Sequence, residues 1–182
     1  MTGRVLGAVL VGGASSRFGS DKAAAMWAGA TLADHAAVAI TPFVAEVVRI
    51  GGDGLPDLPR AGLGPLGGIA AALDHAGRRG FHSVLTIACD MPTLPDGLVE
   101  ALLRRAPACC ADAPVLGHWP AGLADALIGR LASSTPSCEA PGRHLRNATL
   151  SIRRWAENIG ALPIRSPVPL ANVNTPADLL AL

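Results

Sequence analysis

Residues 9–22 read VLVGGASSRFGSDK, an apolar run that ends in two glycines and leads to two cations, Arg17 and Lys22. Glycines such as Gly12 and Gly13 let backbone N–H groups approach an anion closely, while arginine offers a planar fork of donors and lysine a compact charge. The stretch fits neither the GxxxxGK(S/T) pattern of P-loops nor the GxGxxG of dinucleotide-binding enzymes. It predicts a phosphate-binding loop of another kind, and the alternative is a glycine-rich turn with solvated charges.

A carboxylate and two amides later in the chain are further candidates for contacts with a ligand. Asp90 directly follows the apolar run 83–88, where it can bind a Mg²⁺ ion that bridges nucleotide phosphates; the alternative is that it caps the next helix. Asn172 and Asn174 alternate along ANVNTP, so in an extended segment they point to one side and can contact a ligand. The alternative there is a polar turn. The histidines have no metal-ligand spacing and are interpreted as structural or surface residues.

The elements that must position these residues alternate between strands and helices. Residues 4–11 and 83–88 are short, near-continuous apolar runs, typical of strands buried on both faces of a parallel sheet. Residues 45–50 are rich in β-branched side chains and end in GGDG, which predicts a further strand. Helices are expected from a Thr31 cap to about Pro42, over 67–76 and over 95–105. This order predicts an α/β fold, a three-layer, doubly wound, mostly parallel sheet with helices on both faces. In such sheets ligands bind at the carboxyl ends of the strands, where these stretches lie.

Beyond Cys109 the pattern is looser. One helix is expected within residues 115–131 and an amphipathic helix within 151–160, with Trp155 on its apolar face. A last helix is expected to begin at residues 175–178, where TPAD supplies a hydroxyl at the cap, a proline at the first position and a carboxylate at the third. Because 182 residues contain no repeat and no linker, a single domain over residues 1–182 is expected.

Composition excludes several classes of partner and compartment. A net charge of +1 gives no electrostatic footprint for nucleic acid or a membrane surface. The cysteines lack ligand spacing, and adjacent Cys109 and Cys110 make a poor disulfide pair, which indicates reduced thiols. The N-terminal apolar run, about eight residues long, is too short to span a membrane and continues into VGG rather than a cleavage site. We therefore expect a cytoplasmic protein with no nucleic-acid or membrane partner.

Four motifs, LVGGASSRFGSDKA, GPLGGI, CDMPTLP and NVNTPADL, follow one another over nearly the whole chain. Together they resemble the molybdenum cofactor guanylyltransferase family, whose pattern runs LAGGxSxRMGxDK, GPLAG, CDxP and NxNTPxDL. The resemblance implies transfer of GMP from GTP to the terminal phosphate of molybdopterin, with pyrophosphate released and Mg²⁺ as cofactor. It implies a nucleotide-binding half, about residues 1–107, and an acceptor-binding half, about 108–182, with transient contacts to proteins that deliver the cofactor.

Carried over residue by residue, the resemblance implies roles for the first motif. Leu10, Val11 and Gly12 contact the guanine nucleotide, and Gly13 lies in the same turn. Lys22 holds phosphates.

The resemblance also implies roles for Arg17, in the first motif, and for four residues later in the chain. Arg17 neutralises the pyrophosphate, Asp57 helps to bind the base, and Asp90 is the Mg²⁺ ligand. Asn172 and Asn174 lie near the reacting phosphate and the acceptor.

The chain departs from the family pattern in three places. RIGGDG follows the second strand, where the family usually has an Asn for the nucleotide. Val11 and Phe18 replace an Ala and a Met, and both changes are tolerable. The stretch 109–119 is short, and of the family's His-Pro-Leu element only His118, Trp119 and Pro120 remain. The resemblance implies that this last region shapes the acceptor side, so its change bears on the molybdopterin substrate more than on the nucleotide.

Two alternatives to guanylyl transfer onto molybdopterin stay open. One is a related nucleotidyltransferase that moves CMP or GMP onto another phosphorylated acceptor, although VGG and GPLGG favour the guanylyl branch because cytidylyl relatives usually read LAAG. The other is a non-catalytic nucleotide-binding relative. The retention of Arg17, Lys22 and Asp90 speaks against it, and the short stretch 109–119 speaks for it.

Overall fold

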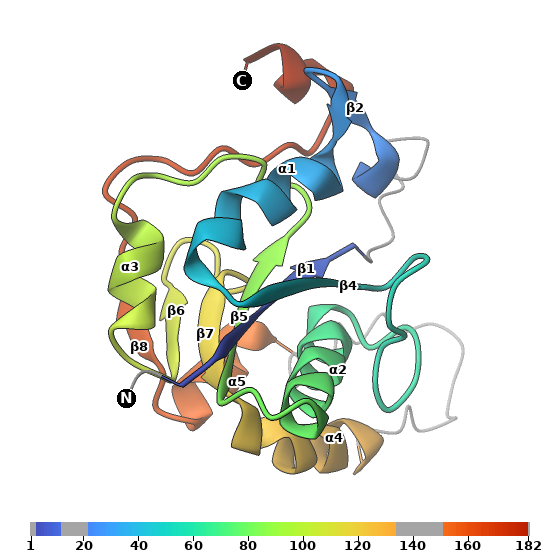
Figure 1. The fold of residues 1–182 in the computed structure, drawn as a ribbon, viewed down its shortest axis with the longest axis vertical. Helices are drawn as coiled ribbons and strands as arrows, with labels where there is room; N and C mark the ends of the chain where they lie inside the picture. Colours follow the sequence, from blue (N-terminus) through green and yellow to red (C-terminus); the bar gives the residue numbers. More distant parts are fainter. Residues whose placement is uncertain (1–2, 12–21, 134–150, 182) are drawn as a thin grey trace, which may run out of the picture.

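The computed structural model describes residues 3–11, 22–133 and 151–181, and its centre is a six-stranded sheet (Figure 1). Along the sheet the strands are β4 (Glu46–Ile50), β1 (Val5–Leu10), β5 (Ser83–Ala88), β7 (Gly117–Pro120), β6 (Ala108–Cys110) and β8 (Leu162–Ile164). β1 pairs in parallel with both β4 and β5, and β8 pairs in parallel with β6. Only β7 runs antiparallel to its neighbours, β5 and β6. The expected mostly parallel sheet is confirmed.

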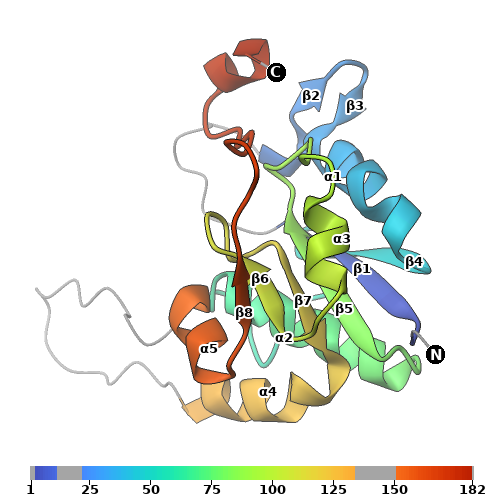
Figure 2. The same cartoon turned by 90° about the vertical axis from the view of Figure 1, so that its left-hand side faces the viewer.

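Helices cover both faces of this sheet. They are α1 (Leu32–Ile40), α2 (Pro65–Arg78), α3 (Leu98–Leu103), α4 (Ala124–Ser133) and α5 (Ile152–Asn158). Short 3₁₀ turns are η1 (Lys22–Ala24), η2 (Thr41–Phe43), η3 (Ala121–Leu123) and η5 (Pro176–Ala181), and a small hairpin joins β2 (Met26–Trp27) to β3 (Ala30–Thr31). α1 and α3 lie on one face, and α2, α4 and α5 lie on the other (Figures 1 and 2). The structure therefore has the three layers expected.

The two-sided burial of β1 explains why its sequence is apolar at almost every position. Leu6, Ala8 and Leu10 belong to the core beneath α2, α4 and α5, while Val9 belongs to the core beneath α1 and α3. Successive side chains of a strand point to opposite faces, so a strand covered on both sides alternates between two apolar cores. A continuous apolar run is the sequence signature of that environment.

Several expected boundaries are confirmed and others shift. Thr31 is the N-cap of α1, and β5 spans the predicted residues 83–88. α3 begins only at Leu98, after Gly97 in a left-handed conformation with φ of 75°, rather than at residue 95. The C-terminal element is a 3₁₀ helix, and its capping group is the Asp178 carboxylate, which accepts from the N–H groups of Asn174 and Thr175.

The second half of the sheet contains three strands that the sequence pattern did not predict. β6, β7 and β8 are three or four residues long, and none of them was expected. Strands this short give almost no periodic signal, and their pairing is decided by contacts distant in sequence. The helices expected in this half, α4 and α5, are confirmed, and Trp155 on α5 is buried as expected.

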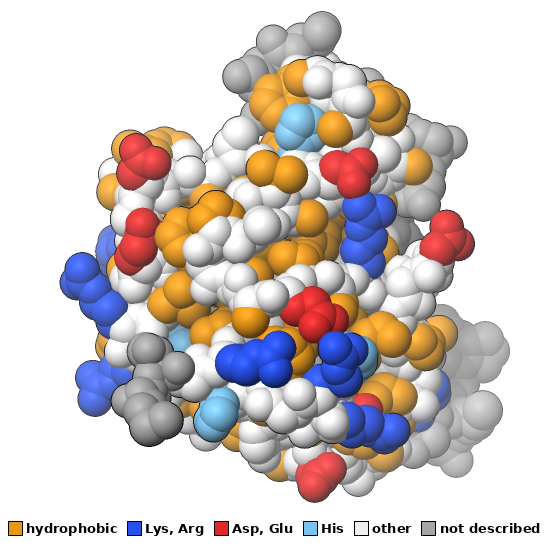
Figure 3. All heavy atoms as spheres, in the orientation of Figure 1, with side chains coloured by type: hydrophobic (Ala, Val, Ile, Leu, Met, Phe, Trp, Pro, Cys, Tyr) orange, Lys and Arg blue, Asp and Glu red, His pale blue; other side chains and the backbone are white. Residues whose placement is uncertain are grey.

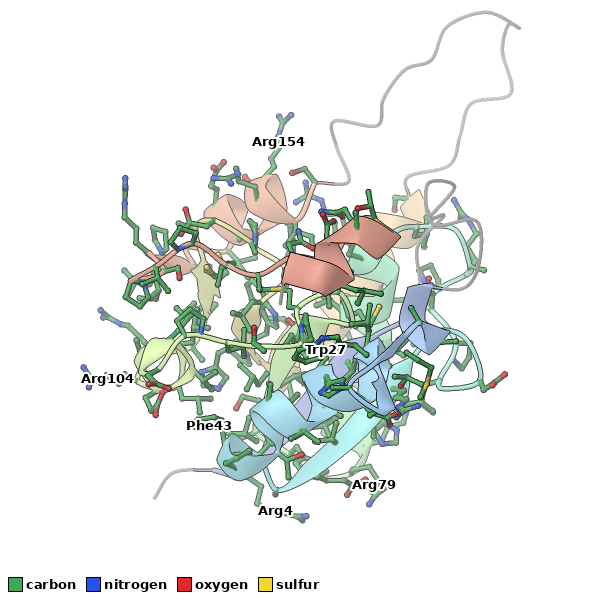
Figure 4. All side chains as sticks on the ribbon, turned by 90° about the horizontal axis from the view of Figure 1, so that it is seen from above. Arg4, Trp27, Phe43, Arg79, Arg104 and Arg154 are labelled. Carbon is green, nitrogen blue, oxygen red and sulfur yellow. The ribbon has the colours of Figure 1, made fainter. Side chains whose placement is uncertain are left out.

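Charged side chains of both signs mix on the face that carries α1 and β4 (Figure 3). On that face Arg79 pairs with Glu46 across 3.1 Å, and Arg49 pairs with Asp34. Arg79, Arg104 and Arg154 point outward from the body (Figure 4). Within the described ranges, no helix combines the length and apolar character that crossing a membrane requires.

Candidate active site

The carboxyl ends of β4, β1 and β5 lie side by side and form one edge of the sheet. The N–H of Val11 donates to the carbonyl of Ile50 at 2.8 Å, and the N–H of Cys89 donates to the carbonyl of Leu10 at 3.1 Å. Leu10 and Val11 therefore lie between the loop after β4 and the residues that follow β5. The carboxyl ends of the three strands meet at one edge as predicted, while residues 12–21 of the first stretch lie outside the described residues.

The rest of the first motif lies outside the residues that can be placed. Gly12, Gly13 and Arg17 are not among the described residues, and Lys22 is described only by its backbone, which begins η1. Their predicted roles stay predictions.

Asp90 is tied to the C-terminal segment by the backbone. The N–H of Val173 donates to the carbonyl of Asp90 at 2.9 Å, and the side chain of Val173 is fully buried. Asn172 and Asn174, on either side of Val173, are both exposed, as the alternation predicted. Because α3 begins with Gly97 at its N-cap, Asp90 does not cap that helix, and the structural alternative for this carboxylate is wrong.

Asp57 lies against the first turns of α2, and the glycines of the GPLGG motif make that contact. A Cβ atom added to Gly67 would lie 3.2 Å from the Cβ of Asp57, and one added to Gly68 would lie 3.6 Å from Oδ1 of Asp57 and 3.2 Å from Cδ2 of Leu10. The N–H of Leu58 also donates to the carbonyl of Gly67 at 3.1 Å. The carboxylate is therefore held near Leu10, the last residue of β1.

Burial raises the pKa of Asp57 above its ordinary value of 3.8. Burial disfavours the charged form of a carboxyl group. Within the described part of the chain the carboxylate makes no hydrogen bond and no ion pair. A partly desolvated carboxylate without a protein partner costs stability, and such groups concentrate at binding sites. Asp57 therefore has the properties of a carboxylate that could accept hydrogen bonds from a ligand.

A cavity of about 370 Å³ opens at the ends of β1 and β4, on the face of the sheet that α1 covers. Val11, Arg49 and residues 51–54 line it.

The Arg49 guanidinium forms an ion pair with Asp34, whose pKa is lowered first by its hydrogen bonds with Thr31 and then by Arg49. Asp34 and Thr31 form a capping box, of which only the Thr31 cap was predicted. Its signal, an acidic residue three positions after the cap, was present in the sequence.

The family resemblance implies a Mg²⁺ ion at Asp90, so the side chains that could bind a metal there decide whether the ion fits. Among the described residues, no group of three or more His, Cys, Asp or Glu side chains could form a metal site of its own. Mg²⁺ at nucleotide sites usually takes one or two carboxylates and completes its shell with phosphates and water. A single carboxylate such as Asp90, at the edge where the nucleotide motifs meet, fits that mode of binding.

His118, the histidine that the short stretch 109–119 retains, lies in the protein core. It is 6 % exposed, with Nε2 2.8 Å from Oγ of Ser83 and Nδ1 3.0 Å from the carbonyl of Arg105. The interpretation of His118 as a structural residue is therefore confirmed, because β7 carries it under α3.

Three of the described residues, Cys89, Cys109 and Cys110, are buried cysteines outside any disulfide. Burial, and then the neighbouring Cys110, raises the pKa of Cys109. Because the thiolate is the reactive form, these environments fit packing groups rather than nucleophiles.

Comparison with known proteins adds a family match and close relatives. A family model described as "MobA-like NTP transferase domain" matches residues 7–151. A molybdenum cofactor guanylyltransferase from Rhodobacter capsulatus is 34% identical over 97% of this chain and 93% of its own. Another, from Rhizobium leguminosarum bv. trifolii, is 32% identical over 96% and 90%.

Solved structures share the fold. Molybdopterin-guanine dinucleotide biosynthesis protein A from Archaeoglobus fulgidus superposes with a TM-score of 0.67 at 23% identity, over 97% of this chain and 95% of that one. The 2-C-methyl-D-erythritol 4-phosphate cytidylyltransferase of Thermus thermophilus gives 0.62 at 16% identity, over 100% and 96%. At these identities the likeness establishes the fold alone, which guanylyl and cytidylyl enzymes share.

Proposed function

The chain belongs to the molybdenum cofactor guanylyltransferase family, and from that premise we propose that it transfers GMP from GTP to the terminal phosphate of molybdopterin. One observation carries the proposal. The hydrogen bonds from Cys89 to Leu10 and from Val173 to Asp90 join three of the four family motifs at one edge of the sheet. The fourth motif, GPLGG, starts α2 beside Leu10.

The chemistry requires positioning more than acid–base groups. An oxygen of the acceptor phosphate attacks the α-phosphorus of GTP, a new P–O bond forms, and the bond to the β-phosphate oxygen breaks as pyrophosphate leaves with the electron pair. The nucleophile is already an anion, so no strong base is needed. The barrier is the repulsion between two highly charged groups, which alignment and charge neutralisation lower.

On the nucleotide side, Leu10 and Val11 form the wall and Asp57 reads the base. Guanine presents two adjacent donors, N1–H and the exocyclic amine, and a carboxylate accepts both. Adenine and cytosine lack that pair of donors. The unpaired, half-buried carboxylate of Asp57 beside Leu10 supports this role.

Asp90 would hold the Mg²⁺ ion, which when bound supplies positive charge to the phosphates. Arg17 and Lys22 neutralise the pyrophosphate as it leaves, as the family resemblance implies. Asn172 and Asn174 donate to the acceptor phosphate from the far side of Asp90, a role that their exposure on either side of Val173 supports.

The proposal includes one domain, with a nucleotide half at about residues 1–107 and an acceptor half at about 108–182. It also includes a cytoplasmic location, which the free thiols Cys89, Cys109 and Cys110 support, and transient contacts with proteins that deliver the pterin.

The first test is calorimetric titration of GTP, CTP and ATP, each with Mg²⁺ and then with EDTA. We expect tight binding of GTP alone, weakened by EDTA. Pyrophosphate release on addition of molybdopterin then tests transfer. Asp90→Ala should retain the fold and lose Mg²⁺-dependent transfer, whereas Asp96→Ala, an exposed carboxylate six residues further on, should behave as wild type. Full transfer by the Asp90 variant would remove Asp90 from the site.

The shared fold of the Thermus cytidylyltransferase makes CTP a meaningful second candidate. Tight binding of CTP in place of GTP would move the assignment to the cytidylyl branch. Binding of GTP without pyrophosphate release would indicate a nucleotide-binding relative that has lost its chemistry.

A further inference from the structure

The loop of residues 111–116, which we call the β6–β7 loop, leads into β7 beside the carboxyl end of β5. β7 runs antiparallel beside β5, with Gly117 opposite Thr86. Continuing that register places Leu116 and Val115 beside the last two residues of β5, Ile87 and Ala88, two positions before Asp90. The β6–β7 loop is therefore next to the edge at which Asp90 and the C-terminal segment meet.

Three side-chain hydrogen bonds hold this loop. Arg153 on α5 donates to the carbonyl of Ala111 at 2.9 Å, and the Asp112 carboxylate accepts from the N–H of Ser166 at 3.1 Å. Both contacts are exposed, so water competes for them. The third is a hydrogen bond from Oγ1 of Thr86 to the carbonyl of Val115 at 2.6 Å, and Thr86 is fully buried.

The neighbours of Thr86 fix the direction of its hydroxyl proton. The indole N–H of Trp119 donates to Oγ1 of Thr86 at 2.8 Å, and an indole N–H can only donate. The hydroxyl proton must therefore go to a carbonyl, with Val115 at 2.6 Å and Gly117 at 3.3 Å. Trp119 is itself fully buried and packs against Trp155 with ring centroids 4.8 Å apart.

We propose that Thr86 is a positioning residue for the acceptor side of the proposed reaction. Its hydroxyl holds the β6–β7 loop at Val115 and thereby sets the wall against which the pterin phosphate is aligned. This inference rests on the proposed function. The described residues proposed for nucleotide binding, Leu10, Val11 and Asp57, make no hydrogen bond with Thr86, so loss of the hydroxyl should act on the acceptor and leave GTP largely unaffected.

The test compares Thr86→Val, which keeps the shape and removes the hydroxyl, with Thr86→Ser, which restores it. Ser83→Ala is the matched control. Ser83 is on the same strand, and its buried hydroxyl lies 2.8 Å from a buried ring nitrogen of His118, but it is at the end of β5 away from the site. Initial rates of pyrophosphate release are measured with molybdopterin varied at saturating GTP, and then with GTP varied.

We expect Thr86→Val to raise the KM for molybdopterin roughly tenfold or more, with the KM for GTP within about twofold of wild type. Thr86→Ser should restore the acceptor KM, and Ser83→Ala should leave it unchanged. An unchanged acceptor KM in Thr86→Val, or an equal rise in Ser83→Ala, would overturn the proposal.

Amide hydrogen exchange separates this inference from the proposed function. If wild type releases no pyrophosphate with molybdopterin, the proposed function fails on its own. Faster exchange across residues 111–116 in Thr86→Val, and not in Ser83→Ala, still supports positioning of the loop by Thr86. Unchanged exchange there refutes it.

Discussion

At the scale of the residue, Asp57 is the side chain in which stability and proposed function oppose each other. Its carboxylate is half-buried, its pKa is raised by burial, and no described residue bonds to it. Binding sites commonly retain groups that the fold alone would be better without. Asp34 is the opposite case, because its hydrogen bonds with Thr31 and its ion pair with Arg49 lower its pKa.

Asp57→Asn should increase the free energy of unfolding at pH 7 and weaken GTP binding. The folded pKa lies above the unfolded one, so the wild-type penalty begins as pH rises through the ordinary value of 3.8 and is complete above the raised pKa. The gain in stability should therefore disappear near pH 3. Urea denaturation at both pH values and calorimetry with GTP measure the two effects.

Asp34→Asn is the control for the sign of that effect. Because the pKa of Asp34 is lowered in the folded protein, its carboxylate stabilises the fold at pH values above the ordinary pKa of 3.8. That stability is lost as the pH falls through the lowered pKa. This variant should be less stable than wild type at pH 7. A destabilised Asp57→Asn variant at pH 7 would contradict the interpretation of Asp57 as an unpaired, desolvated carboxylate.

At the scale of the element, α2 illustrates why a motif can contain glycine inside a helix. Gly67 and Gly68 lie in its first turns, where glycine is a poor helix former, yet they let Asp57, Leu63 and Leu10 approach the helix backbone. The proposed base-reading residue depends on that approach. The element therefore gives up helix stability to hold a side chain from a preceding loop.

Gly67→Ala should weaken GTP binding and give no net gain in stability. An added Cβ would lie 3.2 Å from the Cβ atoms of both Asp57 and Leu63, which are attached to the backbone and cannot rotate away. Gly129→Ala in the middle of α4 is the matched control, because nothing lies within 4 Å of its added Cβ.

The control should gain about 0.5–1 kcal/mol in free energy of unfolding from helix propensity alone, with GTP binding unchanged. Thermal unfolding and calorimetry of both variants provide the comparison. An equal gain in Gly67→Ala, with normal GTP affinity, would show that the close packing of Asp57 on α2 does not matter.

At the scale of the whole molecule, the chain returns to its first half to complete the site. After β8 it runs back along the molecule to the end that carries the β2–β3 hairpin (Figure 2). Val173 is buried and bonded to Asp90 on the way. Residues separated by more than eighty positions thus form the two sides of one edge, with nucleotide motifs on one side and paired asparagines on the other.

The double variant Asn172→Ala, Asn174→Ala should separate these two sides. We expect GTP affinity within about threefold of wild type and a fall in transfer on the order of a hundredfold, because only the alignment of the acceptor is lost. Asn158→Ala, an exposed amide at the end of α5, is the control and should leave both values unchanged. A large loss of GTP affinity in the double variant would place these amides on the nucleotide instead.

The sequence alone determined the architecture of the first half of this protein. β1 and β5 are buried strands with strong apolar patterns, and β4 is a β-branched strand at the edge of the sheet. The residues that follow β1 and β5, Val11 and Asp90, had to meet at one edge because parallel strands share their carboxyl ends. The capped helix α1 was also predictable, since its signals are local.

Only the tertiary structure decided the rest. β6, β7 and β8 are too short for a periodic signal, and the burial of His118, the contact of Asp57 with Gly67 and the hydrogen bond from Thr86 to Val115 all join positions ten or more residues apart. Local sequence fixes which residues can form a strand or a helix, because backbone preference and burial pattern act over a few positions. Which side chains then meet depends on the packing of elements, and that is a property of the whole chain.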